Sequence, residues 1–400
     1  MINIVDKAMC CGCGTCMNIC PKQCISMEKD KYGFLYPRID FDTCINCGLC
    51  EKSCPEINKP EMSGDRLDTG YIVRNRNQRV LMKSTSGGFF YGLCQYVCSN
   101  KGAVYGVLID EKMNVLHSRA ETIDDCERFL GSKYVQSNTG TVYQKVQKDL
   151  NDGVLVCFSG TPCQVQGLYN YLNRKSYDNL ILVDIVCHGV VSAKTWNSYL
   201  EYEQHKNGAS VCDVQFRSKK YGYQNSAMRI RIGDKEIYGT SRTNPYLRCF
   251  YANIALRDSC YKCPAKTLKR VSDFTIFDSW NAHSVIGKKD DDKGYTNVIV
   301  QSYKGAELME KLSSNMEIHK VKLDQIIPKS GGMILKSSSM NPNRNAFLDE
   351  VCNDSFESAF NHYLYIHKKD YIIERTKFFA SKFSLFRRMS KFKRDALRKA

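Results

Sequence analysis

The chain has 400 residues, 43% of them hydrophobic, and a formal net charge of +16. This length and composition predict about two or three domains with real cores, and they exclude a disordered chain. A strongly basic chain is often a nucleic-acid-binding protein, but residues 382–400 alone hold eight basic residues against Asp395. Because nearly half of the excess charge lies in this one segment, we expect no nucleic-acid partner.

The same composition bears on where the chain acts. No apolar run is long enough to cross a membrane, and residues 1–9 contain Asp6 and Lys7 but no apolar signal-peptide core. The 21 cysteines would suggest disulfides in a secreted protein, yet their spacing suits metal binding. We therefore expect a cytoplasmic protein in a reducing setting, such as that of an anaerobe.

The first predicted element is a doubled cysteine motif. Each copy has three cysteines separated by two residues and a fourth after three more, followed by proline: Cys10, Cys13, Cys16, Cys20 and Pro21, then Cys44, Cys47, Cys50, Cys54 and Pro55. In two-cluster ferredoxins the fourth cysteine of each copy binds the other cluster. The spacing therefore predicts two 4Fe-4S clusters, one bound by Cys10, Cys13, Cys16 and Cys54, the other by Cys44, Cys47, Cys50 and Cys20.

Residues 1–58 are expected to form this dicluster ferredoxin-like domain. Short strands at 24–27 and 34–36 flank a polar turn, which predicts a hairpin between the two copies. Zinc knuckles or a disulfide framework are the alternative, although zinc sites normally use separated cysteine pairs. Cys11 and Cys24 fall outside the pattern, as packing thiols or as substitute ligands. A polar linker follows at 56–68.

A mixed α/β body is expected after the linker. Over residues 69–190, strands are predicted at 71–73, 103–109, 154–158 and 180–186, with helices at 89–98, 122–129 and 141–150. A helix at 192–205, capped by Ser192, follows, and this alternation indicates α/β layers. Within residues 191–340, polar connections separate strands at 214–216, 228–232, 236–238, 274–277 and 298–301, which predicts an antiparallel portion.

Residues 341–400 are expected to form a helical tail. Apolar residues recur at three- to four-residue steps from Phe379 to Leu397, which predicts a helix over about 377–399 with basic residues on its other faces. Such a helix suits an anionic membrane surface, so we expect peripheral contact at the inner face of the membrane. A terminal helix that packs on the body or frays is the alternative.

Four further cysteines lie in turns marked by glycine or proline: Cys163, Cys187, Cys260 and Cys263. The first two follow predicted buried strands, where α/β folds place their chemistry. Because metal ligands cluster in such loops, these four are candidates for a third 4Fe-4S cluster. The alternative is that they are small buried residues.

The segments around these cysteines resemble the beta-subunit family of coenzyme F420 hydrogenases and dehydrogenases. The resemblance covers the chain to about residue 340 and is carried by residues 84–89, 131–134, 160–168, 184–189, 257–264 and 272–280. It implies an oxidoreductase that holds FAD and passes electrons between iron-sulfur clusters and a hydride donor or acceptor. Coenzyme F420 is itself a candidate substrate, although many bacterial relatives occur in organisms without this deazaflavin.

The resemblance also implies residues for the flavin, which links one-electron clusters to two-electron hydride transfer. The expected FAD contacts are Ser86, Gly87, Gly88, Lys133, Gly160 and Thr161. The two glycines open a helix and offer N–H groups to a pyrophosphate, or they mark an ordinary helix start. Lys133 and His188 are candidate catalytic residues, one neutralising a phosphate or the flavin, the other donating a proton. A solvated lysine and a histidine that orients the Cys187 turn are the alternatives.

The expected partners are a redox protein or subunit and a small-molecule hydride carrier. Two other functions compete with the oxidoreductase. The chain could be an electron-transfer subunit without its own substrate, or an accessory protein of surface-polysaccharide synthesis. Bound flavin and turnover of a hydride donor would favour the oxidoreductase, whereas clusters without flavin would favour the electron-transfer subunit.

Overall fold

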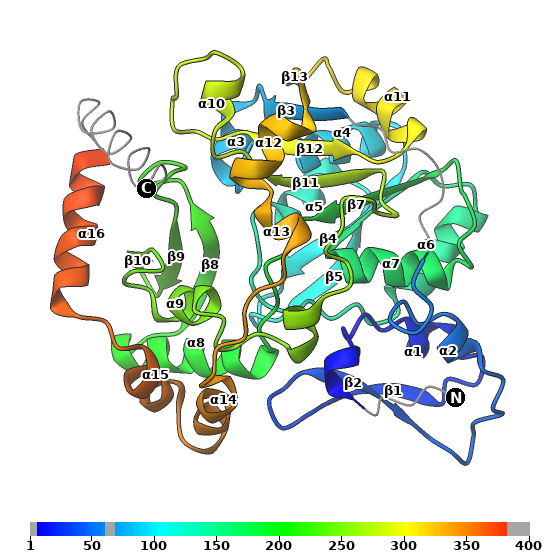
Figure 1. Cartoon of the computed structure of the whole chain (residues 1–400), viewed down its shortest axis with the longest axis horizontal. Coiled ribbons are helices and arrows are strands. Elements are labelled where there is room, and N and C mark those ends of the chain that lie inside the picture. Colours follow the sequence, from blue (N-terminus) through cyan, green and yellow to red (C-terminus); the bar gives the residue numbers. More distant parts are fainter. Residues whose placement is uncertain (1–5, 61–68, 382–400) are drawn as a thin grey trace.

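The computed structural model describes residues 6–60 and 69–381. Figure 1 shows a small N-terminal domain beside a large sheet, with a smaller sheet and the C-terminal helices at the other end. The second half of the expected linker and most of the expected helix at 377–399 lie outside the described residues. Among the helices that are described, none combines the length and hydropathy needed to span a membrane.

The N-terminal domain is a hairpin with two short helices. β1 (Ile25–Lys29) pairs antiparallel with β2 (Leu35–Ile39), as predicted. After a short 3-10 turn, η1 (Lys7–Met9), come α1 (Thr15–Ile19) and α2 (Leu49–Lys52). Each helix follows a glycine with a left-handed backbone, Gly14 (φ 78°) and Gly48 (φ 74°), a conformation that other residues adopt only with strain. The core of this domain consists largely of cysteines.

The body is organised by an eight-stranded sheet in the order β13-β3-β12-β11-β7-β6-β4-β5. Its strands are β3 (Thr69–Asn75), β4 (Ala103–Ile109), β5 (Val115–Ala120), β6 (Val156–Gly160), β7 (Leu180–Ile185), β11 (Phe274–Asp278), β12 (Thr296–Val300) and β13 (Met316–Lys322). The central strands β4, β6, β7 and β11 are parallel, and the outer pairs are antiparallel. β6 and β7 are almost wholly apolar because both faces of the sheet are covered.

Helices cover both faces of this sheet, which confirms the predicted α/β layers (Figure 1). On one face lie α4 (Phe89–Ser99), α5 (Ile123–Cys126) and α11 (Tyr303–Lys311). On the other lie α6 (Val142–Asn151) and α7 (Pro162–Tyr171). The helix expected at 122–129 is instead α5 followed by a 3-10 turn, η2 (Glu127–Phe129). Shorter helices line the periphery: α3 (Gln78–Lys83), α10 (Ala282–Val285), α12 (Leu323–Ser330) and α13 (Gly332–Leu335).

A three-stranded antiparallel sheet forms the other end of the body, as the sequence predicts. It consists of β8 (Val211–Ser218), β9 (Ala227–Ile232) and β10 (Lys235–Gly239). The strands expected at 274–277 and 298–301 return to the large sheet as β11 and β12, because β11 pairs in parallel with β7. The large sheet therefore draws on residues from both expected parts of the body.

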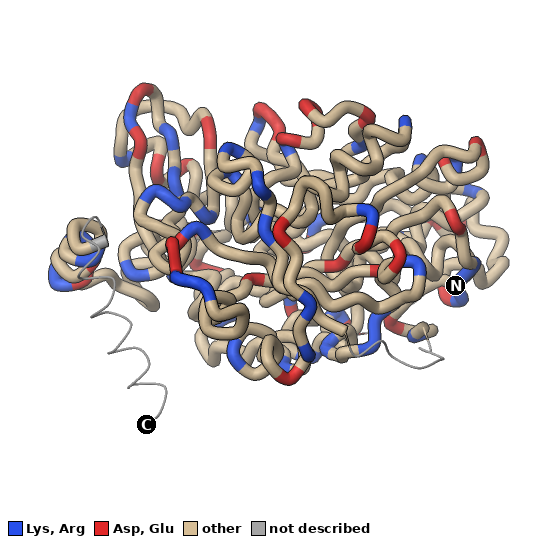
Figure 2. Tube along the Cα trace, turned by 90° about the horizontal axis from the view of Figure 1, so that it is seen from above, with Lys and Arg blue, Asp and Glu red and all other residues tan. Residues whose placement is uncertain are grey.

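Helices pack around the small sheet. α8 (Ala193–Asn207) begins at Ser192, whose hydroxyl accepts from the N–H of Thr195 at 3.2 Å, as the predicted cap requires. α8 shares an aromatic core with α9 (Pro245–Tyr251), α14 (Arg344–Asn353) and α15 (Phe356–Leu364), and α16 (Lys368–Ser381) stands beyond it (Figure 1). Figure 2 shows basic and acidic residues interspersed along the described chain.

Candidate functional site

The cysteines expected to bind the second cluster gather around one small cavity. Its lining includes Cys20, Cys44, Cys47 and Cys50. The last cysteine of the first motif thus lies beside the second motif, which the crossed pattern requires. Cys24 lines the same cavity, and its Sγ lies 3.3 Å from that of Cys20. Cys24 is therefore a fifth thiol beside the expected ligands of the second cluster.

The cysteines expected to bind the first cluster also lie together. Burial raises the pKa of the Cys16 thiol, and the neighbouring thiols of Cys13, Cys10 and Cys54 raise it further. Burial likewise raises the pKa of Cys54 to about 11. Thiols with such pKa values ionise at neutral pH only when a metal replaces the proton, so these groups suit iron.

The described residues contain no group of three or more His, Cys, Asp or Glu side chains arranged around one metal ion. This finding includes the cysteines of the doubled motif and also Cys163, Cys187, Cys260 and Cys263. A 4Fe-4S cube binds each thiolate at a different iron atom, so its ligands need not converge on one point. The ligand sets given above stay predictions.

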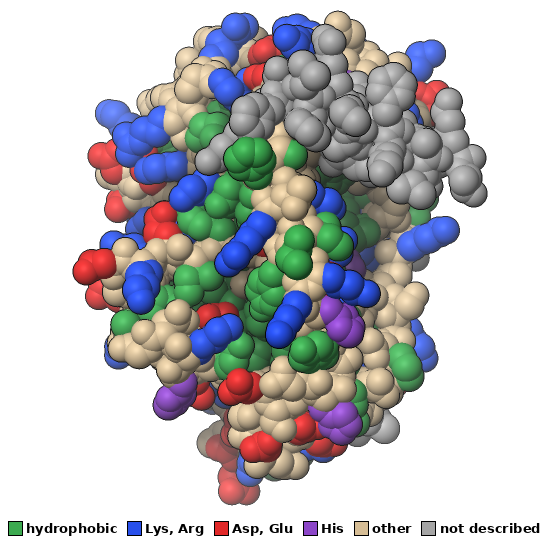
Figure 3. Space-filling model, turned by 90° about the vertical axis from the view of Figure 1, so that its left-hand side faces the viewer, with side chains coloured by type: hydrophobic (Ala, Val, Ile, Leu, Met, Phe, Trp, Pro, Cys, Tyr) green, Lys and Arg blue, Asp and Glu red, His purple; other side chains and the backbone are tan. Residues whose placement is uncertain are grey.

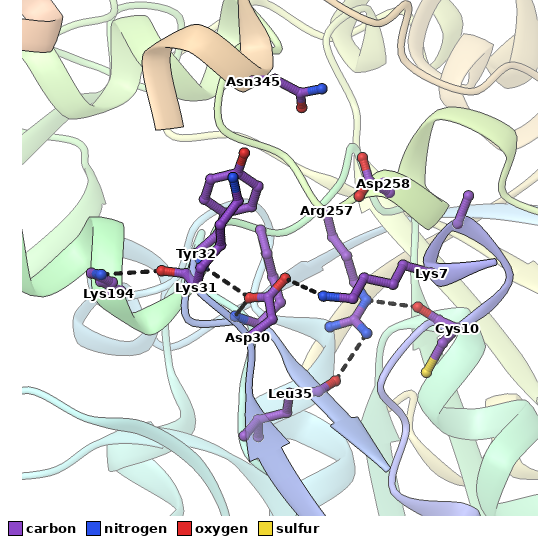
Figure 4. A network of polar contacts seen from close by, with 12 residues as sticks. Lys7, Cys10, Asp30, Lys31, Tyr32, Leu35, Lys194, Arg257, Asp258 and Asn345 are labelled. Atoms are coloured by element: carbon purple, nitrogen blue, oxygen red, sulfur yellow. Dashed lines mark hydrogen bonds and ion pairs between the residues drawn. The ribbon is translucent and has the colours of Figure 1, made fainter. Parts of the chain in front are cut away.

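Arg257 fastens the N-terminal domain to the body (Figure 4). Its side chain is wholly buried, and it donates to the backbone oxygens of Cys10 at 2.7 Å and Leu35 at 2.9 Å. It also donates to Oε1 of Gln136 at 3.0 Å, and its guanidinium lies 4.2 Å from the centre of the Tyr36 ring. Buried charged hydrogen bonds are strong and directional. Arg257 therefore fixes the first cluster motif against the body.

Close packing supports this attachment. Thr139 donates from Oγ1 to the backbone oxygen of Cys13 at 3.1 Å, and Gln136 donates to that of Cys11 at 3.0 Å. A Cβ on Gly167 of α7 would lie 2.6 Å from Oγ1 of Thr15 in α1. Only glycine allows the two helices to approach so closely. The cluster motif is thus held by both backbone and side-chain contacts.

A cavity of about 490 Å³, here called the redox cavity, opens where the central strands end. The loops that follow β6, β7 and β11 line it, and the N-terminal domain contributes Cys11 and Glu56. Open α/β sheets bind ligands at the carboxyl ends of their parallel strands. The volume lies within the range of about 300–1,000 Å³ that small-molecule sites occupy. The redox cavity is therefore the candidate site for a cofactor and substrate.

All four turn cysteines line the redox cavity: Cys163, Cys187, Cys260 and Cys263. Cys163 follows β6 in the first turn of α7, and Cys187 follows β7. Cys260 lies in a 3-10 turn, η3 (Asp258–Lys262), and Cys263 ends it. Burial raises the pKa of Cys187 to about 12 and that of Cys263 to about 11, and the thiol of Cys163 adds to both shifts. The fold thus brings four thiols together from three distant segments.

Cys11 connects this group to the dicluster domain. Its side chain is 8% exposed, and the neighbouring thiols of Cys13 and Cys163, together with burial, raise the pKa of Cys11. The neighbouring Cys11 thiol is the main reason why the pKa of Cys13 falls to about 7. Cys13 is an expected ligand of the first cluster, and Cys163 belongs to the candidate third set. A continuous line of thiols therefore leads from the N-terminal domain into the redox cavity.

Most of the residues expected to hold FAD also line the redox cavity, namely Ser86, Gly88, Lys133, Gly160 and Thr161. Gly87 has another role. Its N–H donates to Oγ1 of Thr296 at 2.8 Å, and a Cβ there would lie 2.2 Å from the backbone oxygen of Val73. The N–H of Gly87 is thus bonded within the protein, and the glycine allows this loop to pack against β3 and β12.

Comparison with known families agrees with this geometry. Residues 9–57 match the family model of the 4Fe-4S dicluster domain, and residues 154–326 match that of the C terminus of the coenzyme F420 hydrogenase/dehydrogenase beta subunit. Each of these two stretches is therefore similar to the family whose model it matches. The second match contains all four turn cysteines of the redox cavity. It ends before α14, so the C-terminal helices lie outside the beta-subunit family match.

Among solved structures, the chain is similar to one from the F420-reducing [NiFe] hydrogenase complex of Methanosarcina barkeri. The two are 16% identical, with a TM-score of 0.44, and the likeness covers 76% of this chain and 94% of the other. No curated protein matches the chain. Residues 84–134, which supply one wall of the redox cavity, lie outside both family matches.

Lys219 holds this wall in place, although it was not predicted from the sequence. It is 3% exposed, and its Nζ donates to the backbone oxygens of Leu81 at 2.7 Å, Ser86 at 2.5 Å and Lys293 at 2.7 Å. Burial lowers the pKa of Lys219 to about 7. The sequence offers one signal for the burial of Lys219. It lies two residues after Arg217, and residues two apart on a strand point to the same face of the sheet. Because lysines after a strand usually point to solvent, the sequence does not indicate that Lys219 binds these backbone oxygens.

Lys133 also binds the backbone. Its Nζ donates to the backbone oxygens of Phe129 and Leu130, both at 3.0 Å, and of Arg128 at 3.3 Å. Burial lowers the pKa of Lys133 to about 7. The side chain therefore closes the η2 turn while lining the redox cavity. A role toward phosphate or flavin stays a prediction.

His188 is held by a neighbouring amide. Its Nε2 lies 2.7 Å from Oδ1 of Asn253, so Nε2 carries the proton. Burial lowers the pKa of His188, which keeps the ring neutral at pH 7. Its backbone oxygen accepts from the Ser338 hydroxyl at 2.7 Å. These contacts fit an orienting role for the turn after β7, and proton donation stays a prediction.

Proposed function

We propose that the chain is an iron-sulfur flavoprotein that passes electrons between 4Fe-4S clusters and a hydride donor or acceptor through FAD. The dicluster domain and the beta-subunit family support electron transfer in oxidoreduction. One observation carries the finer proposal: Cys11 of the N-terminal domain lines the redox cavity together with Cys163, and its thiol is a neighbour of those of Cys13 and Cys163. A cluster bound by Cys13 and a cofactor in the redox cavity would thus be separated by few side chains.

The residues of the redox cavity fit a flavin. Aromatic and aliphatic side chains make up much of its wall, including Phe89, Phe129, Val135 and Ile185, and a few polar groups converge on the same space. This mixture is typical of cofactor sites. FAD bound there would exchange one electron at a time with clusters and two electrons as hydride with a substrate.

The protein's own groups then have definite tasks. Ser86 and Thr296 bond through their hydroxyls at 2.8 Å, which shapes the loop at the start of α4. Lys219 fixes the same loop from behind. The neutral ring of His188 holds a proton at Nε2 beside the Cys187 turn. Arg257 keeps the first cluster motif at a constant distance from the cavity.

A redox partner protein would approach from the side of the second cluster. Cys47 is exposed there, and so are the apolar side chains of Ile45 and Leu49, which line the same small cavity. Exposed apolar groups around a redox centre are typical of contact sites for another protein. This observation favours a second candidate function, an electron-transfer subunit without a substrate of its own.

Flavin content separates the two functions. We expect full-length protein purified without oxygen to contain about one FAD per chain, the number that one redox cavity would hold. Ser132 lines the cavity and contacts Thr85, so Ser132→Trp would fill the space and expel the flavin. Ser99→Trp, at the exposed end of α4, is the matched control and would retain it. Wild-type protein with intact clusters and no FAD would leave only the electron-transfer subunit.

A further inference from the structure

A second cavity, of about 560 Å³, lies between the small sheet and α16. We call it the α16 chamber. Its lining comes from β8, the loops after β8, β10 and β11, α9 and α16. Figure 3 faces this side of the molecule, where Lys and Arg side chains surround hydrophobic ones. Because α16 begins after residue 326, this chamber depends on a part of the chain outside the beta-subunit family match.

The lining of the α16 chamber is basic. It contains four basic side chains, Arg217, Arg242, Arg248 and Lys377, against Asp370 and Glu374. The Asp370 carboxylate forms ion pairs with two guanidinium groups, with that of Arg242 at 3.0 Å and with that of Arg248 at 3.6 Å. Glu374 accepts hydrogen bonds from the hydroxyls of Thr240 and Thr243. Positive charge therefore exceeds negative charge in a hollow that also offers serine and threonine hydroxyls, a combination that binds phosphate oxygens.

The chamber also has flat aromatic walls. Phe378 of α16 stacks on Tyr221 with ring centroids 3.6 Å apart, and Trp280 stacks on Tyr223 at 4.7 Å. Phe378, Trp280 and Tyr251 all line the chamber. Aromatic faces fixed by their neighbours offer stacking surfaces for another ring at little entropic cost. Phosphate-binding groups next to such surfaces are what a nucleotide requires.

The α16 chamber adjoins the redox cavity. Arg217, Tyr251 and Trp280 line both. Arg217 is 6% exposed and is held by Asp278 at 3.0 Å and Ser226 at 2.6 Å. Its Nη2 has no hydrogen-bond partner among the described residues, so its donor capacity is not exhausted. The two hollows are therefore neighbours across one layer of side chains that includes the Arg217–Asp278 ion pair.

We propose that the α16 chamber binds the nucleotide end of a dinucleotide hydride carrier, whose hydride-bearing end is directed to the redox cavity. The carrier's redox role rests on the proposed function, whereas nucleotide binding in the chamber does not require flavin. The phosphates would contact Arg242 and Arg248, and the base would lie against the aromatic wall. α16 forms one wall of this nucleotide site. The C-terminal segment would therefore contribute to substrate binding, although it lies outside the residues that match the beta-subunit family.

Calorimetric titration of the anaerobically purified full chain tests this, with ADP-ribose and inorganic pyrophosphate as probes. We expect ADP-ribose to bind more tightly than pyrophosphate, because only ADP-ribose offers a ring to stack. Arg242→Gln with Arg248→Gln would weaken ADP-ribose binding at least about tenfold, since two charged contacts are lost. Arg231→Gln removes the same charge from an exposed position on β9 and is the matched control, with no expected change.

A second variant keeps the charged residues of the α16 chamber and fills its volume. Asn225→Trp would fill the chamber from the loop between β8 and β9 and abolish ADP-ribose binding. Unchanged ADP-ribose binding in both chamber variants, or equal affinity for the two probes, would overturn the inference. Iron and FAD contents measured on the same samples keep the two proposals apart. Protein that binds ADP-ribose in the chamber without FAD would refute the proposed function alone, and protein with FAD but no ADP-ribose binding would refute the chamber alone.

Discussion

The N-terminal domain and the redox cavity are both built from cysteines in glycine-marked turns, but the sequence encodes them in opposite ways. In the N-terminal domain, every expected ligand lies between residues 10 and 54, and the spacing itself places the thiols. In the redox cavity, Cys163, Cys187, Cys260 and Cys263 are joined only by the order of β6, β7 and the loop before β11. Local cysteine spacing therefore determines the site in the N-terminal domain, whereas sheet topology determines the redox cavity.

The two regions also depend on each other for stability. The N-terminal domain has a small core of its own that consists largely of cysteines, and its hairpin residues Tyr32, Phe34 and Tyr36 pack into the core of the body. Arg257 supplies contacts to Cys10, Leu35 and Gln136 that this core lacks. The comparison thus predicts that attachment of the domain is more sensitive to one buried arginine than to contacts at its surface.

Arg257→Met gives the largest expected effect. It leaves the backbone oxygens of Cys10 and Leu35 without their donor, and each hydrogen bond to a charged group contributes about 1.5–3 kcal/mol. Denaturant unfolding without oxygen would measure this change in the free energy of unfolding. Lys7→Met is the control, because Lys7 pairs with Asp30 at 3.4 Å and is itself exposed, a contact of at most about 1 kcal/mol. Equal effects of the two variants would contradict the account.

Features that depend on local sequence are predicted from the sequence, whereas features that depend on distant contacts are not. The hairpin, α4, β4 and the Ser192 cap of α8 are found where local patterns indicate them. β5 was missed because its polar residues, such as Ser118 and Arg119, suit an edge strand and hide the apolar alternation. Lys219 was missed because a buried lysine looks the same in sequence as an exposed one. The redox cavity itself follows only from the pairing of distant strands.

A second prediction concerns acid and belongs to the body. His117 on β5 is 4% exposed and stacks on Phe158, and burial lowers its pKa from 6.5 to about 4. The unfolded chain therefore binds this proton more readily than the folded chain. Stability from the neutral ring is complete above about pH 6.5 and is lost as the pH falls toward 4, by about 3 kcal/mol.

Denaturant unfolding at several pH values checks this. His117→Phe keeps an aromatic ring beside Phe158, so we expect its free energy of unfolding to fall less between pH 7 and 4 than that of the wild type. His205→Phe, at an exposed position of α8, is the matched control and should follow the wild type. A His117→Phe profile parallel to that of the wild type would show that this histidine is not the acid-sensitive group.

Lys219 gives the third and smallest effect on stability. Lys219→Met would leave the backbone oxygens of Leu81, Ser86 and Lys293 without their donor, at a cost of about 1–3 kcal/mol. Because Ser86 lies in the wall of the redox cavity, FAD content should fall with it. Lys220→Met, at the adjacent exposed position, should change neither quantity. Normal FAD content in Lys219→Met would separate this loop from flavin binding.

The proposed electron path is most complete if Cys163, Cys187, Cys260 and Cys263 hold the predicted third cluster, next to the two predicted in the N-terminal domain. Iron quantification with EPR on the anaerobic full chain tests it most directly. We predict about twelve iron atoms per wild-type chain, and a loss of about four in Cys187→Ser with the signals of the other two clusters retained. Cys94→Ser, a buried position in α4, is the matched control and should lose none. About eight iron atoms in both the wild type and Cys187→Ser would contradict the claim.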